Sequence, residues 1–531
     1  MAPEDRDALP LGSACAAAGL VASGLFKKED IEILSPVIEA SSQNLYRRIV
    51  DAQASLVGFS LYCWNSLYCI DIAERLRKSL PKLLLVAGGP DAERLARLED
   101  PGPFNAVFLG EAEKSLPVWW AQYSQKGTGS DQGQGSVFTQ YFFRTAGAPE
   151  AELPSPWLLG LLAPSPGKAI PWELTRGCPY RCAYCYEGRG SRQVRHISQS
   201  RLEKELSLFT RAGASEAFVL DPTFNLDSPR TLRYLSFLSQ KGQGMGWNFE
   251  IRAELVNRAQ AEAFSFLPCF VQVGLQSSDA RVLELNGRSF DQGKFKEGLR
   301  LLNEAGVVFG LDLIYGLPGD SLAGFRKSVD FALSFSPNHL DIFPLAVLPG
   351  TDMEIRSKEF GLRYDELPPY LLHSHPSFSR QDMDAAATLA SKVNFFYTRG
   401  RAMPWFSSVC AALKLSPSAF LDSFSLPDDE KALGQKDIEV HQCSHARWCC
   451  ESEGREDLIP AVLDLIHFNG AWSRALAEQE KSRVKLAYSL ADLMGSEILK
   501  LSGFVARKKQ KPCGVEIFLG KSGPTARLIK S

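Results

Sequence analysis

The sequence predicts an α/β fold with an N-terminal doubly wound parallel sheet, a partial barrel and a mostly helical C-terminal domain. Apolar, strand-like runs alternate with helix-like segments over residues 8–120, and the alternation returns from residue 169. From about residue 366 the pattern becomes helical. Such alternation is typical of parallel sheets covered by helices. A chain of 531 residues with 45% hydrophobic content can form two or three separate cores.

Residues 1–123 are predicted to form the doubly wound, Rossmann-like sheet. The expected helices are 11–26, 44–54 and 69–79, and the expected strands are 31–34, 55–60, 83–90 and 105–111, the last of this set. Gly88, Gly89 and Gly110 fall at strand ends, where sheets of this type bind ligands. Tight turns would also require glycine at these positions.

Residues 124–168 are predicted to be a linker, because residues 124–137 are polar and glycine-rich. Residues 169–365 are predicted to form a partial TIM-like (βα)6 barrel. Its strands are expected at 172–175, 216–220, 248–252, 270–275, 307–314 and 339–345, and helices at 200–212, 228–240 and 290–305. In barrels of this kind the site lies on the loops that follow the strands. Residues 366–531 are expected to be a helical domain of unknown function, with an ambiguous segment at 436–456 and short strands possible at its end.

Three cysteines lie within eight residues of the loop after the first barrel strand. Cys178, Cys182 and Cys185 have the spacing C-x3-C-x2-C, and no fourth ligand is near, since the next histidine is His196 and the next cysteine is Cys269. Three thiolates can each bind one iron of a cubane cluster and leave the fourth iron open for chemistry. A zinc knuckle, or three unrelated cysteines, is the alternative interpretation.

This spacing, with the aromatic Tyr184 directly before Cys185, resembles the radical S-adenosylmethionine (SAM) superfamily. The order of sheet, linker, barrel and helical tail resembles its cobalamin-binding-domain-containing subfamily with an uncharacterised C-terminal domain. The segments that carry this second likeness are 57–60, 64–65, 87–90, 109–111, 221–225, 250, 274–277 and 312–318.

The resemblance implies that the three cysteines hold a 4Fe–4S cluster whose open iron chelates SAM and whose electron cleaves SAM to a 5′-deoxyadenosyl radical. It also implies a set of cofactor-binding residues: Tyr184, Asp221, Asn225, Glu250, Arg252, Gln276, Ser277, Asp312 and Tyr315, with Gly88, Gly89 and Gly110 in the sheet domain. Purely structural roles are the alternative. Glu250 and Arg252 could form a surface ion pair, and Gln276 and Ser277 could cap a loop. Asp221 and Asn225 could cap the helix that is expected to begin at Ser228.

The expected function is cobalamin-dependent methyl transfer to a small molecule or peptide, with an electron donor such as a flavodoxin or ferredoxin. Two features depart from the cobalamin-binding pattern: no histidine precedes His196, and the expected first strand is missing. Either the true start lies upstream or the sheet lacks a strand. Without cobalamin, a radical rearrangement, cyclisation or adenosyl addition is expected, and a non-catalytic metal or cobalamin sensor is a further alternative. Methylthio transfer to tRNA is disfavoured, because no auxiliary tri-cysteine domain precedes the sheet.

The composition excludes several classes of partner. The net charge of −2 gives no general attraction for nucleic acid or anionic membrane. The chain has no apolar run of roughly 18 residues, as a membrane span would need, and its first residues are too charged for a signal peptide. A cytoplasmic location with reduced thiols is therefore expected.

A second cluster, between His441 and Cys450, contains three cysteines and two histidines within ten residues. Thiolates and imidazoles suit zinc or another soft ion, and a vicinal cysteine pair can trap metalloids. The spacing matches no standard zinc motif, and adjacent cysteines on a helix point about 100° apart. Both a metal or thiol site and an incidental core position remain open here.

Overall fold

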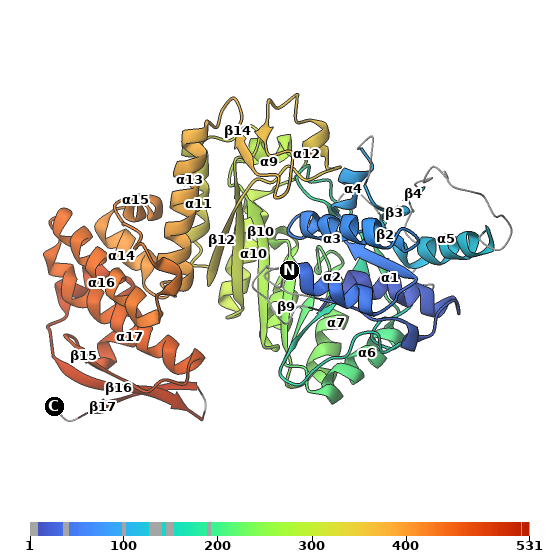
Figure 1. Ribbon diagram of the computed structural model, residues 1–531. Helices are drawn as coiled ribbons and strands as arrows, with labels where there is room; N and C mark the ends of the chain where they lie inside the picture. Colours follow the sequence, from blue (N-terminus) through green and yellow to red (C-terminus); the bar gives the residue numbers. More distant parts are fainter. Residues whose placement is uncertain are drawn as a thin grey trace. The chain divides into compact units, whose positions relative to one another are not determined.

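The computed structural model describes residues 9–35, 42–97, 102–126, 141–144, 153–187, 193–521 and 523–529. Figure 1 shows the arrangement of the elements along the chain. The chain forms two compact units. The first comprises Met1–Gln272, Glu284–Val307 and Leu345–Pro376, and the second comprises Val273–Leu283, Val308–Pro344 and Ser377–Ser531. The four-part domain division expected from the sequence stays a prediction.

The N-terminal sheet has four parallel strands in the order β1 (Leu56–Ser60), β2 (Leu84–Gly88), β3 (Ala106–Leu109) and β4 (Tyr141–Arg144). Its helices are α1 (Leu11–Ala22), α2 (Ser42–Asp51), α3 (Ser66–Ser79), α4 (Ala92–Leu95) and α5 (Ala112–Lys126). Residues 28–30 form a short 3-10 segment.

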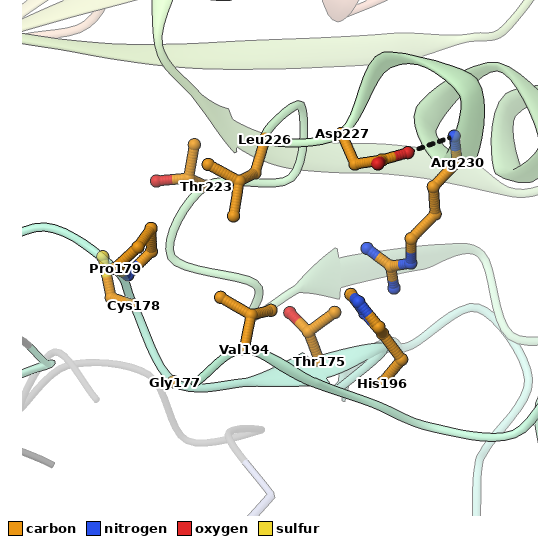
Figure 2. A pocket seen from close by; sticks show the side chains of 10 residues that line it. All are labelled: Thr175, Gly177, Cys178, Pro179, Val194, His196, Thr223, Leu226, Asp227 and Arg230. Atoms are coloured by element: carbon orange, nitrogen blue, oxygen red, sulfur yellow. Dashed lines mark hydrogen bonds between the residues drawn. The ribbon is translucent and has the colours of Figure 1, made fainter. Parts of the chain in front are cut away.

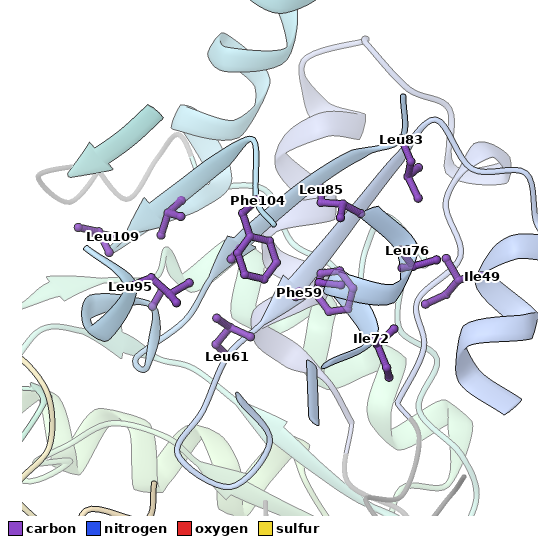
Figure 3. Close-up of a cluster of buried hydrophobic side chains, with 14 residues drawn as sticks. Ile49, Phe59, Leu61, Ile72, Leu76, Leu83, Leu85, Leu95, Phe104 and Leu109 are labelled. Carbon is purple, nitrogen blue, oxygen red and sulfur yellow. The ribbon is translucent and has the colours of Figure 1, made fainter. Parts of the chain in front are cut away.

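Alternate side chains of this sheet enter two apolar cores, as a doubly wound sheet requires. Leu85 and Val107 pack with α2 and α3 in the cluster of Figure 3. Leu84 and Phe108 point the other way and pack with Leu20 of α1 and with α5. The doubly wound architecture expected from the sequence is thereby confirmed.

Two details of this prediction are wrong. Residues 31–34 form no strand; Ile31 and Leu34 instead anchor an irregular segment by packing against the two apolar cores. Residues 105–111 do not hold the last strand, because β4 follows and pairs with β3 inside the expected linker. Most of the glycine-rich stretch 124–137 lies outside the described residues.

The second sheet has six strands in the order β12-β11-β10-β9-β8-β5. These strands are β5 (Ala169–Trp172), β8 (Glu216–Val219), β9 (Gly246–Ile251), β10 (Cys269–Gln276), β11 (Val308–Tyr315) and β12 (His339–Pro344). The connecting helices are α6 (Gln199–Ala212), α7 (Ser228–Lys241), α8 (Arg258–Ser265), α9 (Ala280–Leu285), α10 (Gln292–Glu304) and α11 (Leu322–Leu333). Five of the expected barrel strands are confirmed, but the first lies earlier than expected: β5 ends at Trp172, where the strand predicted over 172–175 begins. An unexpected short hairpin, β6 (Thr175–Arg176) and β7 (Arg195–His196), flanks the cysteine loop.

After the barrel come α12 (Asp352–Ile355) and the hairpin β13 (Arg363–Tyr364) and β14 (Leu372–Ser374). The C-terminal helices are α13 (Arg380–Val393), α14 (Phe406–Leu413), α15 (Pro417–Asp422), α16 (Gln435–Ser452), α17 (Ile459–Ala477), α18 (Leu490–Leu493) and α19 (Leu501–Arg507). Strands β15 (Ser482–Leu486), β16 (Cys513–Gly520) and β17 (Gly523–Ile529) form an antiparallel sheet. The ambiguous segment 436–456 is thus mainly helix α16. Among the described residues, no helix has the length and apolarity that a membrane span requires.

Candidate active site

The cysteine loop follows β5 and is fastened by backbone hydrogen bonds. The Cys185 N–H donates to the Cys182 carbonyl (3.0 Å), which closes a turn. The Ala183 N–H donates to the Asn286 carbonyl, and the Met353 N–H donates to the Ala183 carbonyl, both at 2.8 Å. These contacts fix the loop from outside its own segment and leave the three thiols half-buried and unbridged.

The thiols do not converge on a single ion. Within the ranges that the structure describes, no three or more His, Cys, Asp or Glu side chains are arranged to hold one metal ion. A cubane cluster makes no such demand, since each cysteine binds a different iron. The fixed turn, the half-buried thiols and the missing fourth ligand therefore fit a 4Fe–4S cluster better than a mononuclear zinc site.

A buried cation lies beside this turn. Arg288 is 7% exposed. Burial alone would lower the pKa of its guanidinium, but Tyr184, Cys182 and Glu254 interact with it and raise that pKa. Arg288 is therefore a buried positive charge beside Cys182. The Tyr184 hydroxyl is buried next to Cys182, and burial raises its pKa.

Asp221 follows β8 and supports the strand end from which the cysteine loop departs. It is completely buried, and its Oδ1 accepts hydrogen bonds from the backbone N–H groups of Leu174 and Thr175, both at 2.9 Å. Burial raises the pKa of this carboxyl to about 6. The cap of α7 is supplied by Asp227, so Asp221 does not cap that helix.

Asn225 and Arg252 join the loop after β8 to the end of β9. The Asn225 amide donates to the Arg252 carbonyl and accepts from the Arg252 N–H, both at 3.0 Å. The Arg252 guanidinium is 6% exposed, lies 4.1 Å from the centre of the Tyr180 ring and donates to the Ser289 carbonyl at 2.6 Å. Its Nη1 is buried without a partner in the described chain. Arg252 is therefore a buried residue, and the alternative interpretation of a surface ion pair does not describe it.

Glu250 is exposed at the end of β9, in contrast to its buried neighbours Phe249 and Ile251. Surrounding protein nevertheless raises the pKa of its carboxyl, first by desolvation and then through the charge of Glu187. Glu187 itself has a raised pKa, caused by burial and by Glu173. The first compact unit thus brings acceptor groups close to the cysteine loop, and these can bind hydroxyl or ammonium groups of a ligand.

The expected site residues on and after β10 and β11 lie in the second unit. Gln276 ends β10 with φ +70°, and Ser277 is 1% exposed with its hydroxyl 3.4 Å from that of Ser328. Asp312 lies on β11, and Tyr315 ends this strand, packed on Phe325 with ring centres 5.6 Å apart. Each therefore lies on, or directly after, a strand of the six-stranded sheet, as the motif order predicts.

A cavity of about 260 Å³ opens beside Cys178. Figure 2 shows the Arg230 side chain reaching toward His196 and Thr175 at one end, with Cys178 and Pro179 at the other. The Arg230 Nη2 donates to the Leu174 carbonyl at 3.2 Å, while its Nε is buried and unpartnered among the described atoms. This space gives the cysteine loop a solvent-accessible flank.

An ion network links the N-terminal sheet to the cysteine loop. Arg176, two residues before Cys178, contacts Glu113 at 2.6 Å, Glu173 at 2.8 Å and Glu111 at 3.9 Å. Arg195 of β7 also pairs with Glu111. Because Glu111 follows Gly110 at the end of β3, the carboxyl edge of the sheet lies next to the cysteine loop.

The glycines at this edge have different roles. Gly89 has φ +95°, and a Cβ there would lie 2.5 Å from the Leu61 carbonyl oxygen, so a close backbone approach requires glycine. Gly110 has φ +100°. Near the same edge, the rings of Tyr62 and Trp64 stack with centres 4.6 Å apart, and Trp64 is 37% exposed. An exposed aromatic face beside positions without side chains fits a large flat ligand such as a cobalamin ring.

The His441–Cys450 cluster is divided by the fold. Cys449 and Cys450 are buried, and His445 bonds the Phe420 carbonyl at 2.8 Å within an aromatic core. Cys443 points elsewhere, toward His467 of α17 at 3.8 Å. His445 and Cys449 contact each other at 3.5 Å, but the described residues contain no group of three ligands here that could hold one metal ion.

Sequence reasoning missed Arg176, Arg288 and Arg230. Arg176 lies two residues before the cysteine motif, so its position could have been noted. Its partner Glu113 is 63 residues away, however, and only the folded chain reveals the pair. Arg288 and Arg230 carry no local signal.

Comparison with known proteins agrees with this geometry. Residues 172–332 match the model of the radical SAM superfamily. The chain therefore carries a radical SAM domain, which includes all three cysteines. It is similar to cobalamin-dependent radical SAM methyltransferases.

Two curated relatives illustrate this similarity. The cobalamin-dependent radical SAM methyltransferase TokK of Streptomyces tokunonensis is 23% identical over 367 residues, which cover 63% of this chain and 52% of TokK. The 2-(S-pantetheinyl)-carbapenam-3-carboxylate methyltransferase of Streptantibioticus cattleyicolor is 23% identical over 354 residues, which cover 60% of this chain and 51% of that enzyme. The aligned region spans about half the length of each relative.

Two solved structures share the fold. TsrM of Kitasatospora setae, solved with cobalamin and a 4Fe–4S cluster bound, has a TM-score of 0.51 and 16% identity, covering 68% of this chain and 79% of TsrM. The cobalamin-dependent SAM radical enzyme OxsB has a TM-score of 0.58 and 14% identity, covering 94% of this chain and 80% of OxsB.

Proposed function

We propose that this protein is a radical SAM enzyme that uses cobalamin to transfer a methyl group to a small molecule or peptide. The observation that carries the proposal is the fastened turn with Cys178, Cys182 and Cys185, which offers three thiolates and no fourth protein ligand. When bound there, a 4Fe–4S cluster supplies the electron that cleaves SAM to a 5′-deoxyadenosyl radical. Cobalamin would supply the methyl carrier.

The chain's own residues hold and orient these groups. Arg288 would place a buried positive charge beside a cluster bound at Cys182, and Tyr184 would offer that cluster an aromatic face. Glu250 and Arg252 bind polar groups of SAM, and we assign the same general role to Gln276, Ser277, Asp312 and Tyr315. Asp221 and Asn225 act as positioning residues, because Asp221 bonds the backbone that leads into the cysteine loop and Asn225 bonds the backbone of Arg252.

Cobalamin is assigned to the carboxyl edge of the N-terminal sheet, with Gly88, Gly89 and Gly110 at its strand ends and Trp64 exposed nearby. No histidine precedes His196, so this chain would offer no imidazole ligand from the sheet domain. That feature favours the second candidate function, a cobalamin-independent radical rearrangement, cyclisation or adenosyl addition. An external donor such as a flavodoxin or ferredoxin would reduce the cluster, and we expect no nucleic-acid substrate.

The two candidates are separated by purifying the protein anaerobically with added hydroxocobalamin, then reconstituting the cluster and recording the visible spectrum. We expect about one equivalent of bound cobalamin, as in a one-site holoprotein. The Cys178/Cys182/Cys185 triple alanine variant should keep the cobalamin and lose the cluster absorbance. A wild-type protein that cleaves SAM but binds no cobalamin would contradict methyl transfer and support the second candidate.

A further inference from the structure

Cys443 of α16 faces a histidine and a carboxylate that no part of the proposed SAM chemistry uses. Its Sγ lies 3.8 Å from His467 Nε2, and His467 Nδ1 lies 2.7 Å from Glu439 Oε1. Arg474 pairs with the other oxygen of Glu439. The same Sγ also lies 4.0 Å from His467 Nδ1, so the thiol lies against the imidazole ring, near both of its nitrogens. A thiol beside an imidazole that a carboxylate orients is an arrangement that can activate a cysteine nucleophile.

The fold makes room for this arrangement. Glu439 and Cys443 are one turn apart on α16, and His467, Gly470 and Arg474 follow one face of α17. A Cβ at Gly470 would lie 2.3 Å from Glu439 Oε2, so only glycine lets the carboxylate sit against α17. Glu439 is 12% exposed and Arg474 is 6% exposed, whereas His467 is 41% exposed. The orienting pair is buried, and the imidazole is open to solvent.

We propose that Cys443 is a reactive thiol that undergoes thiol–disulfide exchange with low-molecular-weight disulfides. Its sulfur attacks one sulfur of the disulfide, a new Cys443 S–S bond forms, and the old S–S bond breaks. The departing thiolate takes up the proton that His467 received from Cys443, so one thiol and one disulfide are converted into another thiol and another disulfide. A reducing thiol reverses the step.

The surroundings favour this chemistry over acyl transfer. An acyl-transfer nucleophile needs hydrogen-bond donors for an oxyanion, but Cys443 lies in the interior of an 18-residue helix, whose backbone N–H groups are used by the helix. Exchange at a disulfide sulfur creates no oxyanion. Hydrogen bonds with Cys443 and Glu439 raise the pKa of His467 to about 10, so a positively charged imidazole lies beside the thiol at neutral pH.

The other charged groups around this site do not compete for the ion pair between His467 and Glu439. Arg474 neutralises Glu439 and also lies 3.5 Å from Glu480. Asp464, one turn before His467, accepts the backbone N–H groups of Ala487 and Tyr488 at 2.9 and 2.8 Å. Its carboxylate is therefore engaged with the loop after β15.

The chain offers a matched control in Cys513 of β16. This cysteine is also half-buried, but its thiol donates to the Tyr488 carbonyl at 3.3 Å and faces no imidazole. Full-length, cluster-loaded protein would be treated anaerobically with 5,5′-dithiobis(2-nitrobenzoate) at neutral pH. Peptide mass spectrometry would then measure the modification rate at each cysteine.

We expect Cys443 to react about tenfold faster than Cys513, or more. The His467→Asn variant should lose this advantage at neutral pH and regain it as pH rises, whereas Cys443→Ser should remove the fast phase. A Cys443 rate equal to that of Cys513 in the wild type would overturn the proposal. So would a fast rate that His467→Asn leaves unchanged. The wild-type comparison needs no variant, so the test survives if His467→Asn fails to fold.

Discussion

The Arg176→Gln variant tests whether the N-terminal sheet and the cysteine loop form one stabilised unit. Arg176 is 14% exposed and has Glu113, only 5% exposed, 2.6 Å from its Nη1. Removal of the guanidinium leaves the Glu113 carboxylate buried and unpaired. It also removes the contacts of Arg176 with Glu173 and Glu111. Removing one partner of a buried ion pair lowers the free energy of unfolding by about 3–5 kcal/mol. Because this network keeps some access to solvent, we expect a loss at the lower end, about 3 kcal/mol.

The measurement is anaerobic urea unfolding of the cluster-loaded protein, followed by cluster absorbance and by tryptophan fluorescence. Arg176→Gln should lower the midpoint of both signals, and adding Glu113→Gln should restore part of the loss because the unpaired charge disappears. Arg300→Gln is the matched control, since Arg300 also pairs with two glutamates but lies on the surface; we expect no measurable change. An unchanged midpoint for Arg176→Gln would refute the reasoning.

Two further predictions concern stability. Burial raises the Asp221 pKa from 3.8 to about 6, so the fold favours the protonated carboxyl, and its contribution to stability is lost as pH rises. Between about pH 4 and pH 6 the wild type should lose about 2–3 kcal/mol of unfolding free energy relative to Asp221→Asn. Urea titrations in which both proteins show the same dependence of unfolding free energy on pH would contradict this. A Cβ at Gly298 of α10 would lie 2.0 Å from the Ala253 carbonyl oxygen, so Gly298→Ala should cost about 1–3 kcal/mol. Gly293→Ala, on the same helix beside an exposed cap, should change the thermal midpoint little, and equal effects of the two substitutions would be evidence against the close packing.

The strands could be predicted because their side chains are buried in a regular pattern. Leu84 and Leu85 are buried on opposite faces of the sheet, which makes the run continuously apolar and easy to recognise. β4 was missed because its stability comes from pairing with β3 across a glycine-rich stretch, which local sequence does not encode. The segment 31–34 has the apolar residues of a strand, but it pairs with no other strand of the described chain.

The site was predictable only where spacing itself carries chemistry. The three cysteines show a cluster motif within one loop, whereas the roles of Asp221 and Asn225 depend on which backbone groups the fold brings to them. The roles of Arg288 and Glu113 could not be predicted from the residues next to them in the sequence, because their contacts join distant parts of the chain. The same holds for Cys443, whose partner His467 lies on the next helix.

The most direct test of the central claim is reductive cleavage of SAM. The anaerobically reconstituted protein would be incubated with SAM and a strong reductant, and 5′-deoxyadenosine would be measured by liquid chromatography and mass spectrometry. The wild type should form 5′-deoxyadenosine, and the Cys178/Cys182/Cys185 triple alanine variant should form none. A fully reconstituted wild type that forms no 5′-deoxyadenosine would contradict the account.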